Sequence, residues 1–134
     1  MQPINILLIE NDPIKKDLIK MAVNRLPCYI NCADNNFEAI YRIEKSIPDV
    51  IIMECLLPGM NGFELLKHIK AKKLGSDIYI IMLTSLVFEE IIDQAISLGV
   101  NEVVSFPFDI DDLIQRLEKI QKEKTGLNIA VSTV

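Results

Sequence analysis

The stretch Asp49-Val-Ile-Ile-Met-Glu-Cys-Leu-Leu-Pro-Gly-Met-Asn-Gly62 decides the fold. Residues 49–53 form a β-branched apolar run that is too short for a helix and is typical of a strand buried on both faces of a parallel sheet. A single carboxylate, Glu54, follows this strand, and Leu57-Pro58-Gly59 turns the chain toward a helix. Because open α/β sheets bind ligands outside the carboxyl ends of their strands, Glu54 is at a position typical of a functional site.

The same order of strand and then helix recurs on both sides of this stretch. We expect strands over 4–9, 28–33, 49–53, 78–83 and 102–105, with residues 28–33 at an edge of the sheet. Asp12-Pro13, Asp34-Asn-Asn36 and Asp109 are helix-start signals, and Pro27, Pro48, Gly99 and Gly126 are stop signals. The pattern predicts an α/β fold, a doubly wound five-stranded parallel sheet in the order 2-1-3-4-5, which is the flavodoxin-like arrangement.

Helical periodicity predicts which faces of the helices are buried. The first helix should bury a stripe of five residues, namely Ile14, Leu18, Met21, Ala22 and Leu26. The second should bury Phe37, Ile40 and Ile43, and the third, over about 61–73, Phe63, Leu66 and Ile69. We expect one domain over residues 1–124, and a tail over 125–134 that is a frayed end, a linker stub or a partner-binding segment.

Composition limits the classes of function. The chain has 134 residues, no apolar run of membrane-spanning length and no signal-peptide pattern, so a soluble, cytoplasmic protein is expected. Its net charge of −5 argues against nucleic acid as a direct partner. Cys28 and Cys32 would lie about 13 Å apart on a strand, too far for a disulfide, so all three cysteines are expected to be packing residues.

Polar side chains follow three of the predicted strands. Glu10, Asn11 and Asp12 follow the first, Glu54 the third, and Thr84 and Ser85 the fourth, with Phe106 and Pro107 after the fifth. Carboxylates beside a hydroxyl group indicate either a site for a hard cation or a site of phosphoryl transfer.

The chain resembles the receiver domain of two-component response regulators up to about residue 124. The matching segments are Leu7-Leu-Ile-Glu-Asn-Asp-Pro13, Pro48-Asp-Val-Ile-Ile-Met-Glu54, Leu57-Pro-Gly-Met-Asn-Gly-Phe-Glu64, Ile81-Met-Leu-Thr-Ser85, Ala95-Ile-Ser-Leu-Gly99 and Pro107-Phe108. The resemblance implies an aspartate after the third strand that takes a phosphoryl group from a histidine kinase. It also implies a Mg²⁺-binding acidic pair, a Thr or Ser and a Lys that bind phosphoryl oxygens, and a switch aromatic in the fifth strand.

This sequence departs from the implied set at four positions. Thr84 matches the hydroxyl position and Glu10 the first acidic position, but Asn11 stands at the second, Glu54 at the phosphoacceptor, Phe106 at the lysine and Val103 at the switch aromatic. Glu54 is one methylene too long, which moves its carboxylate by about 1.5 Å. Asn11 removes a charge from the metal site, so Mg²⁺ binding by Glu10, Asn11 and Glu54 should be weak. Phe106 removes the cation that would balance the transferring phosphoryl group.

Three hypotheses follow. The first is a receiver-like signalling module, an atypical pseudo-receiver and not an enzyme, which acts by protein–protein contacts. Its partner would be a sensor kinase, an output protein or a second receiver, including a second copy bound through helix 4, strand 5 and helix 5. Glu54 would then be either a mimic of the phosphorylated aspartate or a residual carboxylate. The second hypothesis is a phosphorylation-competent receiver that uses Glu54 or a neighbour as acceptor. The third, a small-molecule-binding flavodoxin-like domain, lacks a Gly-rich phosphate loop after strand 1.

Overall fold

The computed structural model describes residues 3–57, 59–72 and 77–133, with the backbone alone for Met60 and for 125–133. Five parallel strands form the main sheet: β1 (Ile4–Ile9), β2 (Cys28–Ala33), β3 (Val50–Met53), β6 (Tyr79–Thr84) and β7 (Glu102–Ser105). Their order is β2-β1-β3-β6-β7, so the predicted doubly wound topology and the edge position of residues 28–33 are confirmed.

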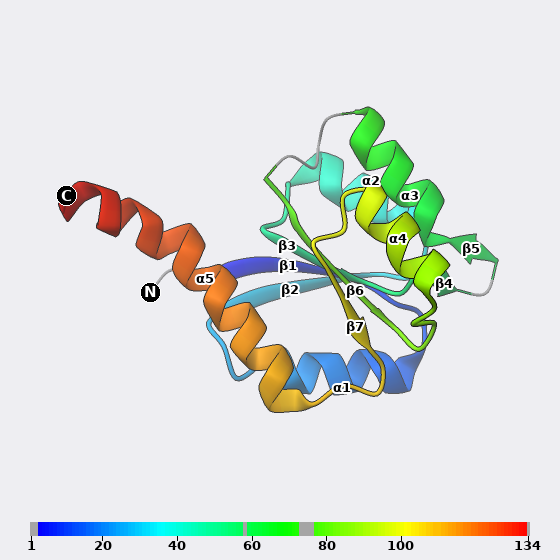
Figure 1. Cartoon of the computed structure of the whole chain (residues 1–134), viewed down its shortest axis with the longest axis horizontal. Helices are drawn as coiled ribbons and strands as arrows, with labels where there is room; N and C mark the ends of the chain where they lie inside the picture. Colours follow the sequence, from blue (N-terminus) through cyan, green and yellow to red (C-terminus); the bar gives the residue numbers. More distant parts are fainter. Residues whose placement is uncertain (1–2, 58, 73–76, 134) are drawn as a thin grey trace.

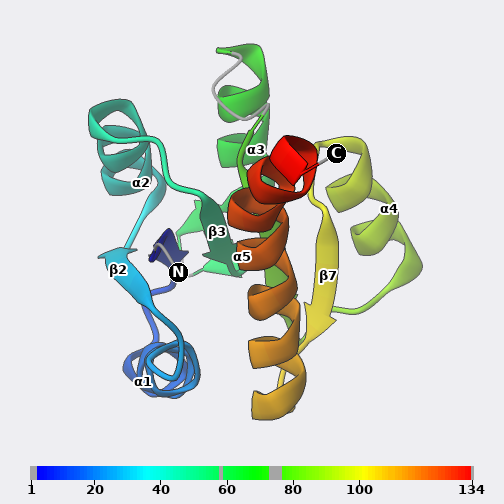
Figure 2. The ribbon, with the colours of Figure 1, turned by 90° about the vertical axis from the view of Figure 1, so that its left-hand side faces the viewer.

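Five helices cover the two faces of this sheet: α1 (Pro13–Val23), α2 (Asn36–Lys45), α3 (Gly62–Ala71), α4 (Glu89–Ser97) and α5 (Ile110–Thr133). Helices α1 and α5 lie on one face, and α2, α3 and α4 lie on the other (Figures 1 and 2). In the part of the chain that is described, no helix is both long and apolar enough to cross a membrane.

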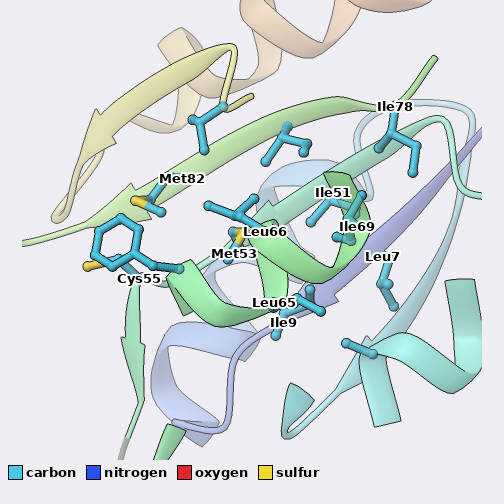
Figure 3. Close-up of a cluster of buried hydrophobic side chains, with 14 of the residues drawn as sticks. Leu7, Ile9, Ile51, Met53, Cys55, Leu65, Leu66, Ile69, Ile78 and Met82 are labelled. Carbon is cyan, nitrogen blue, oxygen red and sulfur yellow. The ribbon is translucent and has the colours of Figure 1, made fainter. Parts of the chain in front are cut away.

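A hydrophobic core lies on each face of the sheet. Figure 3 shows the core beneath α3, where Leu65, Leu66 and Ile69 meet side chains of β1, β3 and β6. The buried face predicted for the third helix, Phe63, Leu66 and Ile69, is therefore confirmed. The cysteines also pack as expected, Cys55 within this core and Cys28 and Cys32 half-buried against the opposite one.

The predicted helix starts are confirmed by hydrogen bonds. The Asp12 carboxylate accepts from the backbone N–H of Ile14 at 2.9 Å, and the Asn35 side chain accepts from Glu38 N at 2.8 Å. Asp109 does the same for Asp112 N at 3.0 Å. Each cap satisfies a backbone donor that the first turn of a helix leaves without a partner.

The predicted buried stripes of α1 and α2 are partly wrong. Ala22 and Leu26 are buried, but Ile14, Leu18 and Met21 are exposed. Phe37 of α2 is 85% exposed, whereas Ile43 is buried. Helix α1 carries two apolar stripes of helical period, and the one that includes Ile19, Ala22 and Val23 docks onto the sheet.

Two local features also differ from expectation. Helix α5 does not end at Gly126 but continues to Thr133, because a single glycine costs a helix only about 1 kcal/mol and no proline follows. After β3 the chain forms a small antiparallel hairpin of β4 (Leu56–Leu57) and β5 (Met60–Asn61), with Gly59 at φ 73°. Pro58 of the predicted turn, and Lys73 at the predicted end of the third helix, lie outside the described residues.

Candidate functional site

The predicted site residues lie together at the carboxyl edge of the sheet. Glu54 N donates to Ile9 O at 3.2 Å, which places Glu54 beside the end of β1 and next to Glu10. Phe106 N donates to Thr84 O at 2.8 Å, so the end of β7 lies beside the end of β6. The parallel register between β3 and β6, with Met53 opposite Met82, joins these two halves.

Both oxygens of the Glu54 carboxylate have partners. Glu54 is 5% exposed, and its Oε1 lies 3.2 Å from Lys15 Nζ in an ion pair. Its Oε2 accepts the backbone N–H of Cys55 at 2.7 Å. The same Lys15 ammonium lies 4.9 Å from the centre of the Phe106 ring, at cation–π distance. A cation from α1 therefore occupies the space between the phosphoacceptor position and the lysine position.

Lys15 was not predicted as a site residue. It stands three residues after the N-cap Asp12, in the first turn of a helix that starts at the strand ends. That placement was available in the sequence, because a side chain at this point of the first turn can reach back over the edge of the sheet. Its partner is 39 residues away in the chain, so the pairing itself carries no local signal.

Glu10 is the second buried carboxylate of the site, at 3% exposed. Burial raises the pKa of Glu10, while the hydrogen bond from Asp12 N and the charge of Lys15 oppose that rise. Its Oε1 accepts the Asp12 N–H at 3.1 Å. Asn11 is half-buried beside it.

The Thr84 hydroxyl is directed to groups other than Glu54. Thr84 is fully buried, its Oγ1 accepts the N–H of Leu86 at 3.1 Å, and it lies 3.3 Å from Cys55 Sγ. Cys55 is a second residue of the site that the sequence did not single out, and burial raises the pKa of its thiol. Val103, at the switch-aromatic position, is half-buried against the core under α4. A phosphoaspartate mimic would be expected to bind the Thr84 hydroxyl, which here contacts the Leu86 N–H and the Cys55 thiol instead.

The residues of the predicted Mg²⁺ site fit that ion poorly. The negative charge of Glu54 is balanced by the Lys15 ammonium, which lies 3.2 Å from Oε1 and would repel a Mg²⁺ ion bound to the same oxygen. Glu10 accepts a backbone N–H, and Asn11 offers only a neutral amide oxygen. Within the described part of the chain, no group of three His, Cys, Asp or Glu side chains is arranged to hold a metal. We therefore assign no chemical step to Mg²⁺.

Comparison with known proteins gives one consistent result. The family model for the response regulator receiver domain matches residues 6–118. The chain is 28% identical over 127 residues to the transcriptional regulatory protein TrcR of Mycobacterium tuberculosis, covering 93% of this chain and 48% of TrcR. It is 32% identical to the transcriptional regulatory protein KdpE of Staphylococcus aureus, covering 92% of this chain and 54% of KdpE. The chain thus spans about half the length of these relatives.

A solved structure has the same fold. The signal receiver domain of a putative LuxO repressor protein from Vibrio parahaemolyticus superimposes with a TM-score of 0.84. The match covers 97% of this chain and 98% of that domain, at 24% sequence identity. At that identity the likeness is one of fold.

Proposed function

The chain belongs to the response regulator receiver family, and we propose that it is a member whose phosphorylation site no longer accepts a phosphoryl group and which signals through protein–protein contacts. The observation that carries the proposal is the ion pair of Lys15 and Glu54 at the phosphoacceptor position. Both carboxylate oxygens of Glu54 already have partners within the chain, so attack on a phosphoryl group or binding of a metal ion would have to compete with the ion pair to Lys15.

The charge balance of the site supports the same proposal. Phosphoryl transfer depends on cations that neutralise the transferring group and on an acceptor held in line with the donor. Here Phe106 replaces the cation after β7, and Asn11 removes one negative charge beside Glu10. The Lys15 ammonium pairs with Glu54, at the phosphoacceptor position, rather than being placed for an incoming phosphoryl group.

Signalling through contacts requires a surface that a partner can recognise. The face predicted for partner binding, made by α4, β7 and α5, is mainly acidic: it exposes Glu89, Glu90, Asp93, Asp111 and Asp112, with Lys119 as an exposed cation. Arg116 on this face is held in ion pairs with Asp112 at 2.9 Å and Glu102 at 3.0 Å. A basic protein surface would complement it. We propose a sensor kinase, an output protein or another receiver as the partner.

A second function is favoured by one observation. Lys15 brings an ammonium group to within 3.2 Å of Glu54, and such a group is also what binds phosphoryl oxygens in an active receiver. If Lys15 moved from Glu54 to an incoming phosphoryl group, Glu54 or a neighbour would become an acceptor, and the chain would be phosphorylation-competent.

Intact-mass spectrometry after incubation with Mg²⁺ and a small phosphodonor separates the two functions. The proposal predicts no added phosphoryl mass on the natural chain. The triple variant Asn11→Asp, Glu54→Asp, Phe106→Lys is the positive control. In this variant the carboxylate at position 54 is shorter and is drawn back from Lys15. Asn11→Asp restores a negative charge at the metal site, and Phe106→Lys restores a cation after β7. We expect this variant alone to gain the mass, and phosphorylation of the natural chain would support the second function instead.

A further inference from the structure

Among the described residues, the edge strand β2 pairs with β1 alone, which leaves its other side without a neighbouring strand. Pro27 O accepts from Ile4 N, and Ala33 O accepts from Glu10 N, both at 3.2 Å, so the odd-numbered residues of this strand direct their backbone groups toward β1. Because successive residues of a strand point their backbone groups in opposite directions, those of Cys28, Ile30 and Cys32 point outward. The outer side of β2 is thus a row of donors and acceptors that a further strand can pair with.

Natural edge strands are usually protected from such pairing by a charged residue, a proline or a bulge. The strand Cys28-Tyr-Ile-Asn-Cys-Ala33 contains no charged residue and no proline, and its six residues pair with β1 in continuous register. Nothing in its own sequence therefore opposes the addition of a strand.

The strand is also complementary to itself. Read in opposite directions about Ile30, it places cysteine opposite cysteine and isoleucine opposite isoleucine. The three side chains Cys28, Ile30 and Cys32 share one face of the sheet, where they pack half-buried at the margin of the core under α1 and α5. A two-fold axis between Ile30 and its copy in a second chain would align this apolar row with the identical row of that chain.

Exposed apolar side chains also lie on β2 and on the two helices that flank this edge. In Figure 2, β2 lies at one margin of the sheet with α1 on one side and α2 on the other. These three elements contribute six of the large hydrophobic residues that are exposed: Ile14, Leu18, Met21, Tyr29, Phe37 and Tyr41. Two of them, Ile14 and Met21, are 72% and 64% exposed. These side chains, on both sides of the edge strand, are available to a partner that docks at this edge.

We propose that two copies of this chain associate through antiparallel pairing of their β2 strands, which joins the two sheets into one continuous sheet. Ile30 faces the partner's Ile30, and Cys28 faces the partner's Cys32. A strand pair alone buries less than the roughly 1,200–2,000 Å² of a stable interface. The exposed side chains of α1 and α2, which meet their counterparts on either side of the junction, supply the remainder.

The register gives a specific chemical test. Residues in a hydrogen-bonded antiparallel pair have Cα atoms about 5.5 Å apart, within the span of a disulfide. Diamide should therefore join Cys28 to the partner's Cys32, with the two thiols giving up two hydrogens to the diazene as the S–S bond forms. Cys28→Ser alone and Cys32→Ser alone should give no covalent dimer. A mixture of the two variants should give one, because each supplies the thiol that the other lacks.

The association itself is tested by light scattering on the untreated protein. We expect the mass of two chains for the natural protein and for Ile30→Val, which keeps the outward N–H. Ile30→Pro, which removes that N–H at a position where an edge strand tolerates proline, should give the mass of one chain. A single-chain mass for the natural protein would overturn the proposal, as would covalent dimers in either single cysteine variant. Because neither Mg²⁺ nor a phosphodonor is used, the result is independent of whether Glu54 accepts a phosphoryl group.

Discussion

Replacement of Lys15 by methionine tests whether its ion pair holds the site together. Lys15 Nζ lies 3.2 Å from Glu54 Oε1, and at an effective dielectric constant near 20 this corresponds to a gross attraction of about 5 kcal/mol. Loss of hydration offsets much of that attraction. The Lys15 side chain is 23% exposed and that of Glu54 6%, so the pair is less enclosed than one whose disruption costs about 3–5 kcal/mol. We expect Lys15→Met to lower the free energy of unfolding by about 1–3 kcal/mol.

Urea denaturation followed by circular dichroism measures this change. Lys16→Met is the matched control, because the neighbouring Lys16 pairs with Asp34, whose side chain is 57% exposed, and should cost less than about 1 kcal/mol. Glu54→Gln should cost less than Lys15→Met, since a lysine left without its partner can turn to solvent and a buried carboxylate cannot. Adding Glu54→Gln to Lys15→Met should restore part of the free energy of unfolding that Lys15→Met alone removes, because the two residues are energetically coupled. Equal stability of the Lys15 and Lys16 variants would refute the reasoning.

Three further variants test neighbouring parts of the site by urea denaturation. Burial raises the pKa of Glu10, so its ionised form opposes folding as the pH rises above the usual value of 4.5. Glu10→Gln should therefore increase the free energy of unfolding at pH 7 and leave it unchanged at low pH. In Gly62→Ala the new Cβ would lie 2.8 Å from Cys55 O and 2.9 Å from Met53 Cε, which should cost about 1–3 kcal/mol. The control Gly59→Ala meets no atom within 4 Å and should cost about 1 kcal/mol, for its positive φ alone. Thr84→Val removes the acceptor of the Leu86 N–H and should cost about 1 kcal/mol.

The topology could be predicted from local signals because each strand and helix start has its own. The short apolar runs gave the strands, and Asp12, Asn35 and Asp109 cap the helices as expected. The end of α5 could not be predicted in the same way, since Gly126 is a weak signal that no proline reinforces. The β4–β5 hairpin is too short for its own alternation pattern to be detected.

The buried faces and the site depended on contacts between distant residues. Helix α1 has two apolar stripes, and only docking onto the sheet buries Ile19 rather than Ile14. The positions of Glu54, Asn11 and Phe106 followed from the motifs, because motifs fix residues relative to strand ends. The partner of Glu54 could not be predicted from the motifs, because Lys15 belongs to another element and is 39 residues away in the chain.

The most direct test of the proposed function is an amide NMR titration, first with Mg²⁺ alone and then with Mg²⁺ and beryllofluoride, a stable analogue of the phosphoryl group. With Lys15 bound to Glu54 and Phe106 at the lysine position, we expect the resonances of Glu54, Thr84 and Val103 to remain where they are. The triple variant Asn11→Asp, Glu54→Asp, Phe106→Lys should respond under the same conditions. Large shifts at these three residues in the natural chain would contradict the account, because they would show that its site still takes up a phosphoryl group.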